Sequence, residues 1–142
     1  MIPLHLDIAL NEIGQTEIPG PGNNPRIAEY LKSVNLPGID KIAHCAAFGN
    51  WCLLKSGVNG TGSGMARSFL SWGYKIVEPR LGCIVVLSRG LNPKLGHFGF
   101  YLDASRGFIR ILGANQGDRV GINAYSKLRL LEYRWNILIP PI

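Results

Sequence analysis

The sequence predicts an α+β fold in which helices precede an antiparallel sheet. Apolar residues recur at helical spacing through the first half of the chain, whereas from Tyr74 onward they gather in short runs separated by turns. Helices followed by strands, without βαβ alternation, favour an antiparallel sheet. The 142 residues are expected to form one domain, residues 1–142, with helices at the N-terminus packed on the sheet.

The first part of the chain predicts two amphipathic helices. Residues 6–13 keep an apolar face at helical spacing, and Gly14 ends the run. Residues 18–23 are rich in Gly and Pro, which excludes a helix or a central strand there. Asn24 then predicts an N-cap, with Pro25 at the first position of a second helix.

The rest of the chain predicts a loop, a short helix and several strands. The glycine-rich residues 59–64 indicate a surface loop; a phosphate cradle is the alternative, but the P-loop lysine pattern is absent. Residues 66–70 keep the spacing of a short helix. The apolar runs that predict strands are residues 83–87, 97–102, 108–112, 120–123 and 131–139.

Composition and charge exclude several classes of protein. With 46% hydrophobic and 17% charged residues, the chain is expected to be globular. The N-terminus lacks a basic segment followed by a long apolar one, so no signal peptide is expected. A net charge of +6 indicates an anionic partner, but the cations are spread along the chain, which disfavours sequence-specific nucleic-acid binding. Three cysteines and scattered histidines predict neither a disulfide framework nor a metal site.

Residues 43–54 predict a helix that carries a cysteine, Cys45, in its first turn. Asp40 is expected to cap the start of this helix, and Gly57 to end it. The positive field of a helix N-terminus favours the thiolate, which is the nucleophilic form of cysteine. The alternative interpretation is a small buried cysteine in an apolar helix.

A cysteine nucleophile needs an imidazole partner and a third group that orients the ring. His97 is the best candidate because it opens a predicted strand, whereas His5 lies near a terminus. His44 adjoins the cysteine in sequence, and neighbouring residues on a helix do not face each other. Asn115 and Gln116 are both candidates to accept the Nδ1 hydrogen of His97, and the turn between the two predicted strands brings Asn115 back to the level of His97. A half-buried structural histidine and a polar turn are the competing interpretations.

Three motifs occur in a fixed order along the chain. Residues 45–51 have the form Cys-Ala-Ala-Phe-x-Asn-Trp, residues 96–101 the form Gly-His-φ-Gly-Phe-Tyr, and residues 112–116 read Leu-Gly-Ala-Asn-Gln. This pattern resembles the NlpC/P60 and CHAP superfamily of papain-like cysteine peptidases, and within it a subgroup of short phage and bacterial proteins. The resemblance spans nearly the whole chain.

The resemblance implies a papain-like fold with a Cys-His-Asn triad. The site residues that it implies are Cys45 as nucleophile, His97 as base, Asn115 as orienting residue with Gln116 as the alternate, and His44 and Trp51 in the substrate groove. Two positions depart from the family pattern. His44 stands where the family usually has tryptophan, and Cys83 where it usually has aspartate.

The implied activity is hydrolysis of an amide bond in or next to the stem peptide of bacterial peptidoglycan, through a thioester acyl-enzyme and without cofactor or metal. A phage endolysin or a toxin-like amidase fits this description. We expect a monomer that acts in the periplasm or cell wall after release or delivery by another system, with an immunity or holin-type protein as partner. Neither nucleic acid nor stable membrane insertion is expected. The alternatives are a non-catalytic wall-binding module and a cysteine acyltransferase or deamidase that acts on protein.

Overall fold

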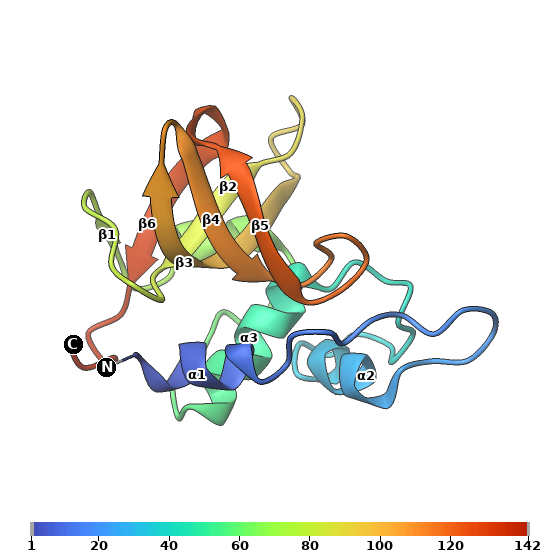
Figure 1. Cartoon of the computed structure of the whole chain (residues 1–142). Coiled ribbons are helices and arrows are strands. Elements are labelled where there is room, and N and C mark those ends of the chain that lie inside the picture. Colours follow the sequence, from blue (N-terminus) through green and yellow to red (C-terminus); the bar gives the residue numbers. More distant parts are fainter. Residues whose placement is uncertain (1, 142) are drawn as a thin grey trace.

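The computed structural model describes residues 2–141 and places a sheet against a layer of three helices (Figure 1). The helices are α1 (Leu4–Leu10), α2 (Pro25–Lys32) and α3 (Cys45–Lys55), with a 3-10 helix η1 at Ala66–Ser71. The strands are β1 (Tyr74–Ile76), β2 (Ile84–Ser88), β3 (Gly96–Ser105), β4 (Phe108–Gly113), β5 (Gly121–Ser126) and β6 (Leu130–Trp135), with a 3-10 turn η2 at Lys127–Arg129. The predicted α+β class with an antiparallel sheet is confirmed.

The strands form one six-stranded sheet in the order β1-β6-β2-β3-β4-β5, and every neighbouring pair is antiparallel. The central strand β2 is buried, as its continuous apolar sequence predicts. It pairs with β3 so that Leu87 lies opposite His97. His97 is the second residue of β3, at the end of the sheet that hydrogen bonds of the β4–β5 turn link to the start of α3.

Helix α3 and strand β3 form the centre of the core. Residues 45 to 53 of α3 are all buried, including Phe48, whose ring packs edge-on against Phe100 of β3 at 6.4 Å between centroids. Gly49 is required at this contact, because a Cβ atom there would lie 2.2 Å from the ring of Phe98. Burial of a phenylalanine contributes about 1.5–3 kcal/mol, so these rings fix the helix firmly on the sheet.

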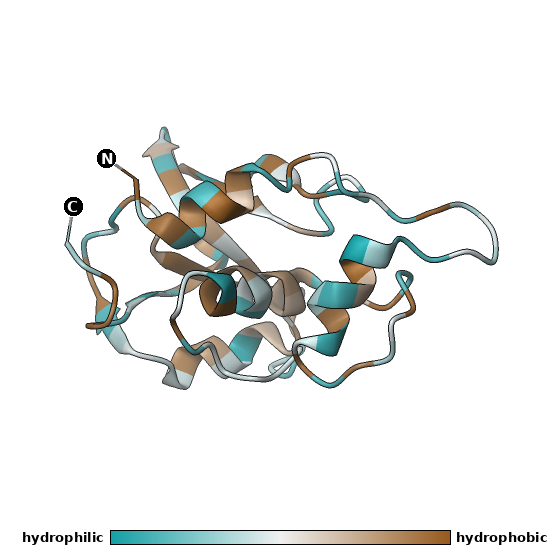
Figure 2. Ribbon diagram, turned by 90° about the horizontal axis from the view of Figure 1, so that it is seen from below, coloured by the Kyte–Doolittle hydropathy of each residue, from teal (hydrophilic) through white to brown (hydrophobic). Residues whose placement is uncertain are grey.

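The helix ends show where the sequence signals were right and where one was wrong. Asn24 caps α2 as predicted, because its side chain accepts hydrogen bonds from the backbone N–H groups of Arg26 and Ile27. The buried residues Ile27, Tyr30 and Leu31 recur at helical spacing along α2, so that one face of the helix is hydrophobic (Figure 2). The N-cap residue of α3 is His44, and the prediction of Asp40 was wrong because that carboxylate bonds elsewhere.

The loop that follows α3 is held in place by a side chain of that helix. The glycine-rich residues 59–64 form an ordered loop, because the side chain of Asn50 bonds to Gly62 N and Ser63 O. The two ends of the chain lie close together, at the left in Figure 1. Within residues 2–141, no helix has the length and apolar character that crossing a membrane requires.

Candidate active site

Cys45 is the first residue of α3, and its side chain is nearly buried, with 7% of the residue exposed. Burial raises the pKa of the thiol, while the backbone N–H of Phe98, the positive charge of Arg89 and the N–H groups at the start of α3 lower it. Burial outweighs the others. The N–H groups at the helix start lower the pKa of Cys45 as expected, but burial raises it more. The resting cysteine is therefore a neutral thiol.

His97 lies at the start of β3 and is 2% exposed. Its Nε2 is 3.0 Å from Oε1 of Gln116, whose amide NH2 group donates to the carbonyls of Ile111 and Gly121 at 3.2 and 2.7 Å. Because both amide hydrogens are used there, Oε1 must be the acceptor that faces the ring, so Nε2 carries the hydrogen. The other nitrogen, Nδ1, is then a lone pair, and it is buried without a hydrogen-bond partner among residues 2–141.

The ring of His97 is neutral at physiological pH. Burial lowers its pKa, the hydrogen bond that the ring donates to Gln116 opposes this, and the positive charges of Arg89 and Arg129 lower it further, to about 4. A neutral imidazole with a free lone pair can accept a proton and so act as a general base. It is also an unusual arrangement, because most buried polar atoms have a partner.

Asn115 does not make the predicted hydrogen bond to His97. Its backbone is left-handed, with φ 58°, and its Oδ1 accepts the backbone N–H of His44 at 2.8 Å. The alternate residue, Gln116, contacts the ring instead, and it does so at Nε2 rather than at Nδ1. The physical reason is that consecutive side chains in this turn point in different directions, so one reaches the start of α3 and the next reaches β3.

Tyr125 of β5 lies beside His97, and the sequence did not predict this neighbour. Its hydroxyl is 3.4 Å from Nε2 of His97, and the two ring centroids are 5.2 Å apart. The guanidinium of Arg129 lies over the tyrosine ring at 5.0 Å and donates to the carbonyl of Ser88. Burial raises the pKa of Tyr125, and a hydrogen bond with Asn123 and the charges of Arg129 and Arg89 lower it by less. A lone aromatic residue on an otherwise exposed strand was the available signal.

The two residues predicted for a substrate groove lie in different places. His44 adjoins Cys45 but is 2% exposed, and its Nδ1 bonds to the carbonyl of Ile42 at 2.8 Å. Trp51 lies six residues further along α3, about 9 Å along the helix axis. It packs edge-on against Tyr30, with the Arg26 guanidinium 5.3 Å from its ring centre. Trp51 therefore belongs to the helical layer and not to the surroundings of the thiol.

The other two cysteines are buried in the core and lack these neighbours. Burial raises the pKa of Cys52 well above its usual range and that of Cys83 to about 12. Cys83, at the departure from the family pattern, is fully buried directly before β2. His5 is also buried, and its Nε2 is 2.7 Å from the carbonyl of Gly82. Among the cysteines of residues 2–141, Cys45 alone starts a helix beside a histidine-bearing strand.

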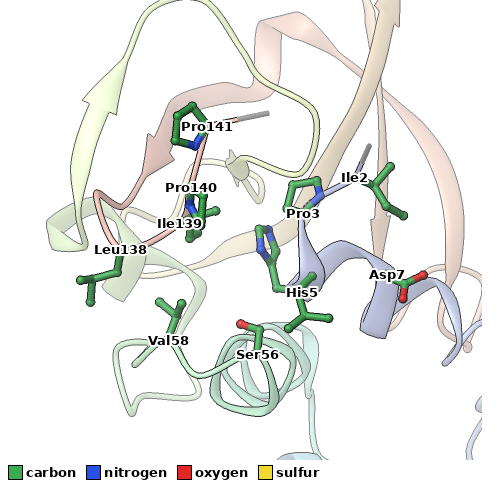
Figure 3. Close-up of a pocket in the computed structure, with 11 residues that line it drawn as sticks. Ile2, Pro3, His5, Asp7, Ser56, Val58, Leu138, Ile139, Pro140 and Pro141 are labelled. Atoms are coloured by element: carbon green, nitrogen blue, oxygen red, sulfur yellow. The ribbon is translucent and has the colours of Figure 1, made fainter.

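A pocket of about 730 Å³ lies away from this site, between the two ends of the chain (Figure 3). Its walls include Pro3, Val58, Ile139 and Pro140, and the side chain of His5 points into the same region. The lining is mainly apolar. Within residues 2–141, no three His, Cys, Asp or Glu side chains gather as metal ligands would.

Comparison with known proteins supports the fold. No protein family matches the sequence. No curated protein matches it either. A solved structure described as similar to a lipoprotein of the NLP/P60 family, from Staphylococcus aureus subsp. aureus Mu50, aligns over 94% of this chain with a TM-score of 0.59 and 18% identity. The chain spans 40% of that protein's length. The chain therefore has the fold of an NLP/P60 family protein.

Proposed function

We propose that the protein is a cysteine-dependent hydrolase that cleaves an amide bond in or next to the stem peptide of bacterial peptidoglycan. The observation that carries this proposal is the free, buried Nδ1 of His97 at the end of the sheet that meets the first turn of α3. The fold, shared with an NLP/P60 family protein, supports a peptidase-like role. The net charge of +6 supports an anionic polymer such as the bacterial wall as the substrate.

In the first step, the sulfur of Cys45 attacks the carbonyl carbon of the scissile amide while its proton moves to Nδ1 of His97. The two groups are both neutral at rest, so this proton transfer accompanies the attack instead of preceding it. The oxyanion that forms is stabilised by the backbone N–H of Cys45 at the helix start. The imidazolium then protonates the leaving amine, the C–N bond breaks, and a thioester remains.

In the second step, water attacks the thioester carbon and gives a proton to Nδ1. Collapse of this intermediate breaks the C–S bond, releases the carboxylic acid and returns the proton to the sulfur. Throughout, Gln116 accepts the Nε2 hydrogen and keeps the ring in one orientation. We assign the orienting role to Gln116, and to Asn115 the role of holding the turn before Cys45 through His44 N.

The proposal extends to location and partners. The enzyme acts on wall material in the periplasm or cell wall, as a monomer that another system releases or delivers, in the manner of a phage endolysin or a toxin-like amidase. An immunity or holin-type protein is the partner that such a role requires. Its substrate needs neither a cofactor nor a metal for cleavage by the route above.

The test is digestion of defined muropeptides followed by mass spectrometry, which also identifies the bond that is cut. The wild-type protein should release fragments that have gained one water, and the folded Cys45→Ala variant should release none. Cys52→Ala is the matched control, because that thiol is buried in the same helix and takes no part in the chemistry. Fragments from folded Cys45→Ala would overturn the proposal. Retention of the wild-type protein on sacculi without cleavage would point to a wall-binding module, and modification of protein glutamine or lysine side chains to a deamidase or acyltransferase.

A further inference from the structure

Lys41 lies in the segment between α2 and α3, and its side chain reaches the loop between α1 and α2, the blue loop at the right of Figure 1. Its ammonium nitrogen lies 2.6 Å from the carbonyl oxygen of Ile18, 2.9 Å from that of Gly20 and 3.0 Å from that of Gly22. Three carbonyls of one short loop thus converge on one positive charge. Backbone carbonyls arranged in this way are the ligands of a hard cation.

Asp40 supplies a fourth oxygen beside the ammonium. Its side chain is completely buried, and Oδ2 accepts the backbone N–H groups of Ile18 and Asn24 at 2.8 and 2.7 Å. Burial raises the pKa of this carboxyl, but those N–H groups and the Lys41 ammonium lower it more, to about 2. The carboxylate is therefore charged, and it stabilises whatever cation lies beside it.

The other oxygen, Oδ1, shows that the ammonium does not satisfy all of the site. Oδ1 is 2.9 Å from the Lys41 nitrogen, yet it has no hydrogen bond from any of residues 2–141. An ammonium group on a side chain has three hydrogens, and three carbonyls accept them. The contact with the buried carboxylate is thus chiefly an ion pair. A spherical ion has no such directional limit and can contact four oxygens equally.

We propose that residues 18–22 together with Asp40 form a cation-binding cage, and that the ammonium of Lys41 is its resident cation. The ligand class that fits in place of the ammonium is a monovalent cation of similar size, K⁺ or free NH4⁺. Removal of the lysine head group leaves a buried carboxylate and three converging carbonyls without a counter-charge. Such a site takes up a cation from solution or loses its structure.

The cage matters because it joins three segments of the chain. Asp40 bonds to the loop through Ile18 and to the start of α2 through Asn24, while its own backbone N–H donates to Asn23 at 2.9 Å. Four residues after Asp40 comes His44, the N-cap residue of α3. The cation in the cage therefore anchors one end of the short segment that leads into Cys45. This inference does not depend on the function proposed above.

The test compares Lys41→Met with wild type in thermal unfolding, in KCl, NH4Cl and tetramethylammonium chloride at equal ionic strength. Lys41→Met keeps most of the side chain but not the charge. Its unfolding temperature should fall by about 5 °C in tetramethylammonium chloride. KCl or NH4Cl should restore at least about half of that loss, with saturation as a single binding site requires. Wild type should have the same unfolding temperature in all three salts.

Two matched variants separate a filled cage from a general salt effect. Lys75→Met removes an exposed lysine from β1 and should show no difference between the salts. Asp40→Asn combined with Lys41→Met removes both charges and should lose the dependence on K⁺. The proposal is overturned if Lys41→Met responds equally to all three cations, or if it remains unfolded in KCl and NH4Cl as well as in tetramethylammonium chloride. Recovery of the folded circular dichroism spectrum in KCl or NH4Cl, but not in tetramethylammonium chloride, supports it.

Discussion

Two buried polar clusters contact different parts of α3, one beside Trp51 and one at the start of the helix. They differ in whether every buried polar atom has a hydrogen-bond partner. In the cluster beside Trp51, Glu12 is nearly buried and both of its oxygens have partners. Oε1 accepts from the Tyr30 hydroxyl at 2.6 Å, and Arg26 bonds to Oε1 and Oε2 at 3.2 and 3.0 Å. In the cluster at the start of the helix, His97 has one nitrogen paired and one without a partner among residues 2–141.

The difference separates a structural cluster from a chemical one. A buried polar atom without a partner costs about 1–3 kcal/mol, so a fold does not retain one without a compensating reason. Both oxygens of Glu12 have partners on α2, so the role of Glu12 is to join the end of α1 to α2. Nδ1 of His97 is unsatisfied only until a proton arrives. We therefore expect mutations in the first cluster to change stability and mutations in the second to change activity.

The largest expected effect is on the base itself. His97→Ala should lower the initial rate of muropeptide release by about 10²–10⁴-fold, because both the proton acceptor for the thiol and the donor for the leaving amine are removed. The unfolding temperature should change little in comparison. Rates from purified, folded protein are the measurement, and a rate within tenfold of wild type would contradict the role of His97.

The next effect distinguishes the two neighbours in the turn. Gln116→Ala should cost about 10 to 1,000-fold in rate, and should add little when combined with His97→Ala, because an orienting group then has no ring to orient. Asn115→Ala should cost less in rate. Its loss frees the N–H of His44 and should instead raise the exchange rate of the first amides of α3. The assignment of the orienting role is wrong if Asn115→Ala lowers the rate more than Gln116→Ala does and adds little when combined with His97→Ala.

A pH effect on stability should come from the second cluster. The pKa of His97 is lowered in the folded state to about 4, so the unfolded chain binds more protons between that value and about pH 6.5. Stability is thus fully present above pH 6.5 and is lost as the pH falls, by roughly 3 kcal/mol at pH 4. Urea unfolding of wild type and His97→Gln at several pH values measures this contribution. His5→Gln is the companion variant, since burial also lowers the pKa of His5.

The smallest effects should come from the first cluster. Tyr30→Phe removes one hydrogen bond to Glu12 in a buried site and should lower the free energy of unfolding by about 1–2 kcal/mol. The rate per folded molecule should not change. A stable Tyr30→Phe protein with a greatly reduced rate would contradict this expectation, because it would show that the two clusters are coupled through α3.

The sequence by itself determined the features that depend on neighbours in the chain. The Asn24 cap, the helix that begins near Cys45 and the buried strand before Ser88 follow from local spacing and local hydrogen bonding, and the structure has all three. The antiparallel sheet followed from the order of helices and strands. Cys45 and His97 were recognisable because each opens an element, and the end of an element is where a side chain can meet another segment.

Only the tertiary structure decided which groups surround that pair. Asn115 and Gln116 are adjacent and chemically alike, and the choice between them depends on a left-handed turn that sends one toward α3 and the other toward β3. The sign of the pKa shift at Cys45 depends on burial by β3, which outweighs the helix field. Asp40 was a good cap by its position, but two backbone N–H groups from another loop hold it elsewhere. Contacts between distant segments decide these matters, and spacing along the chain does not encode them.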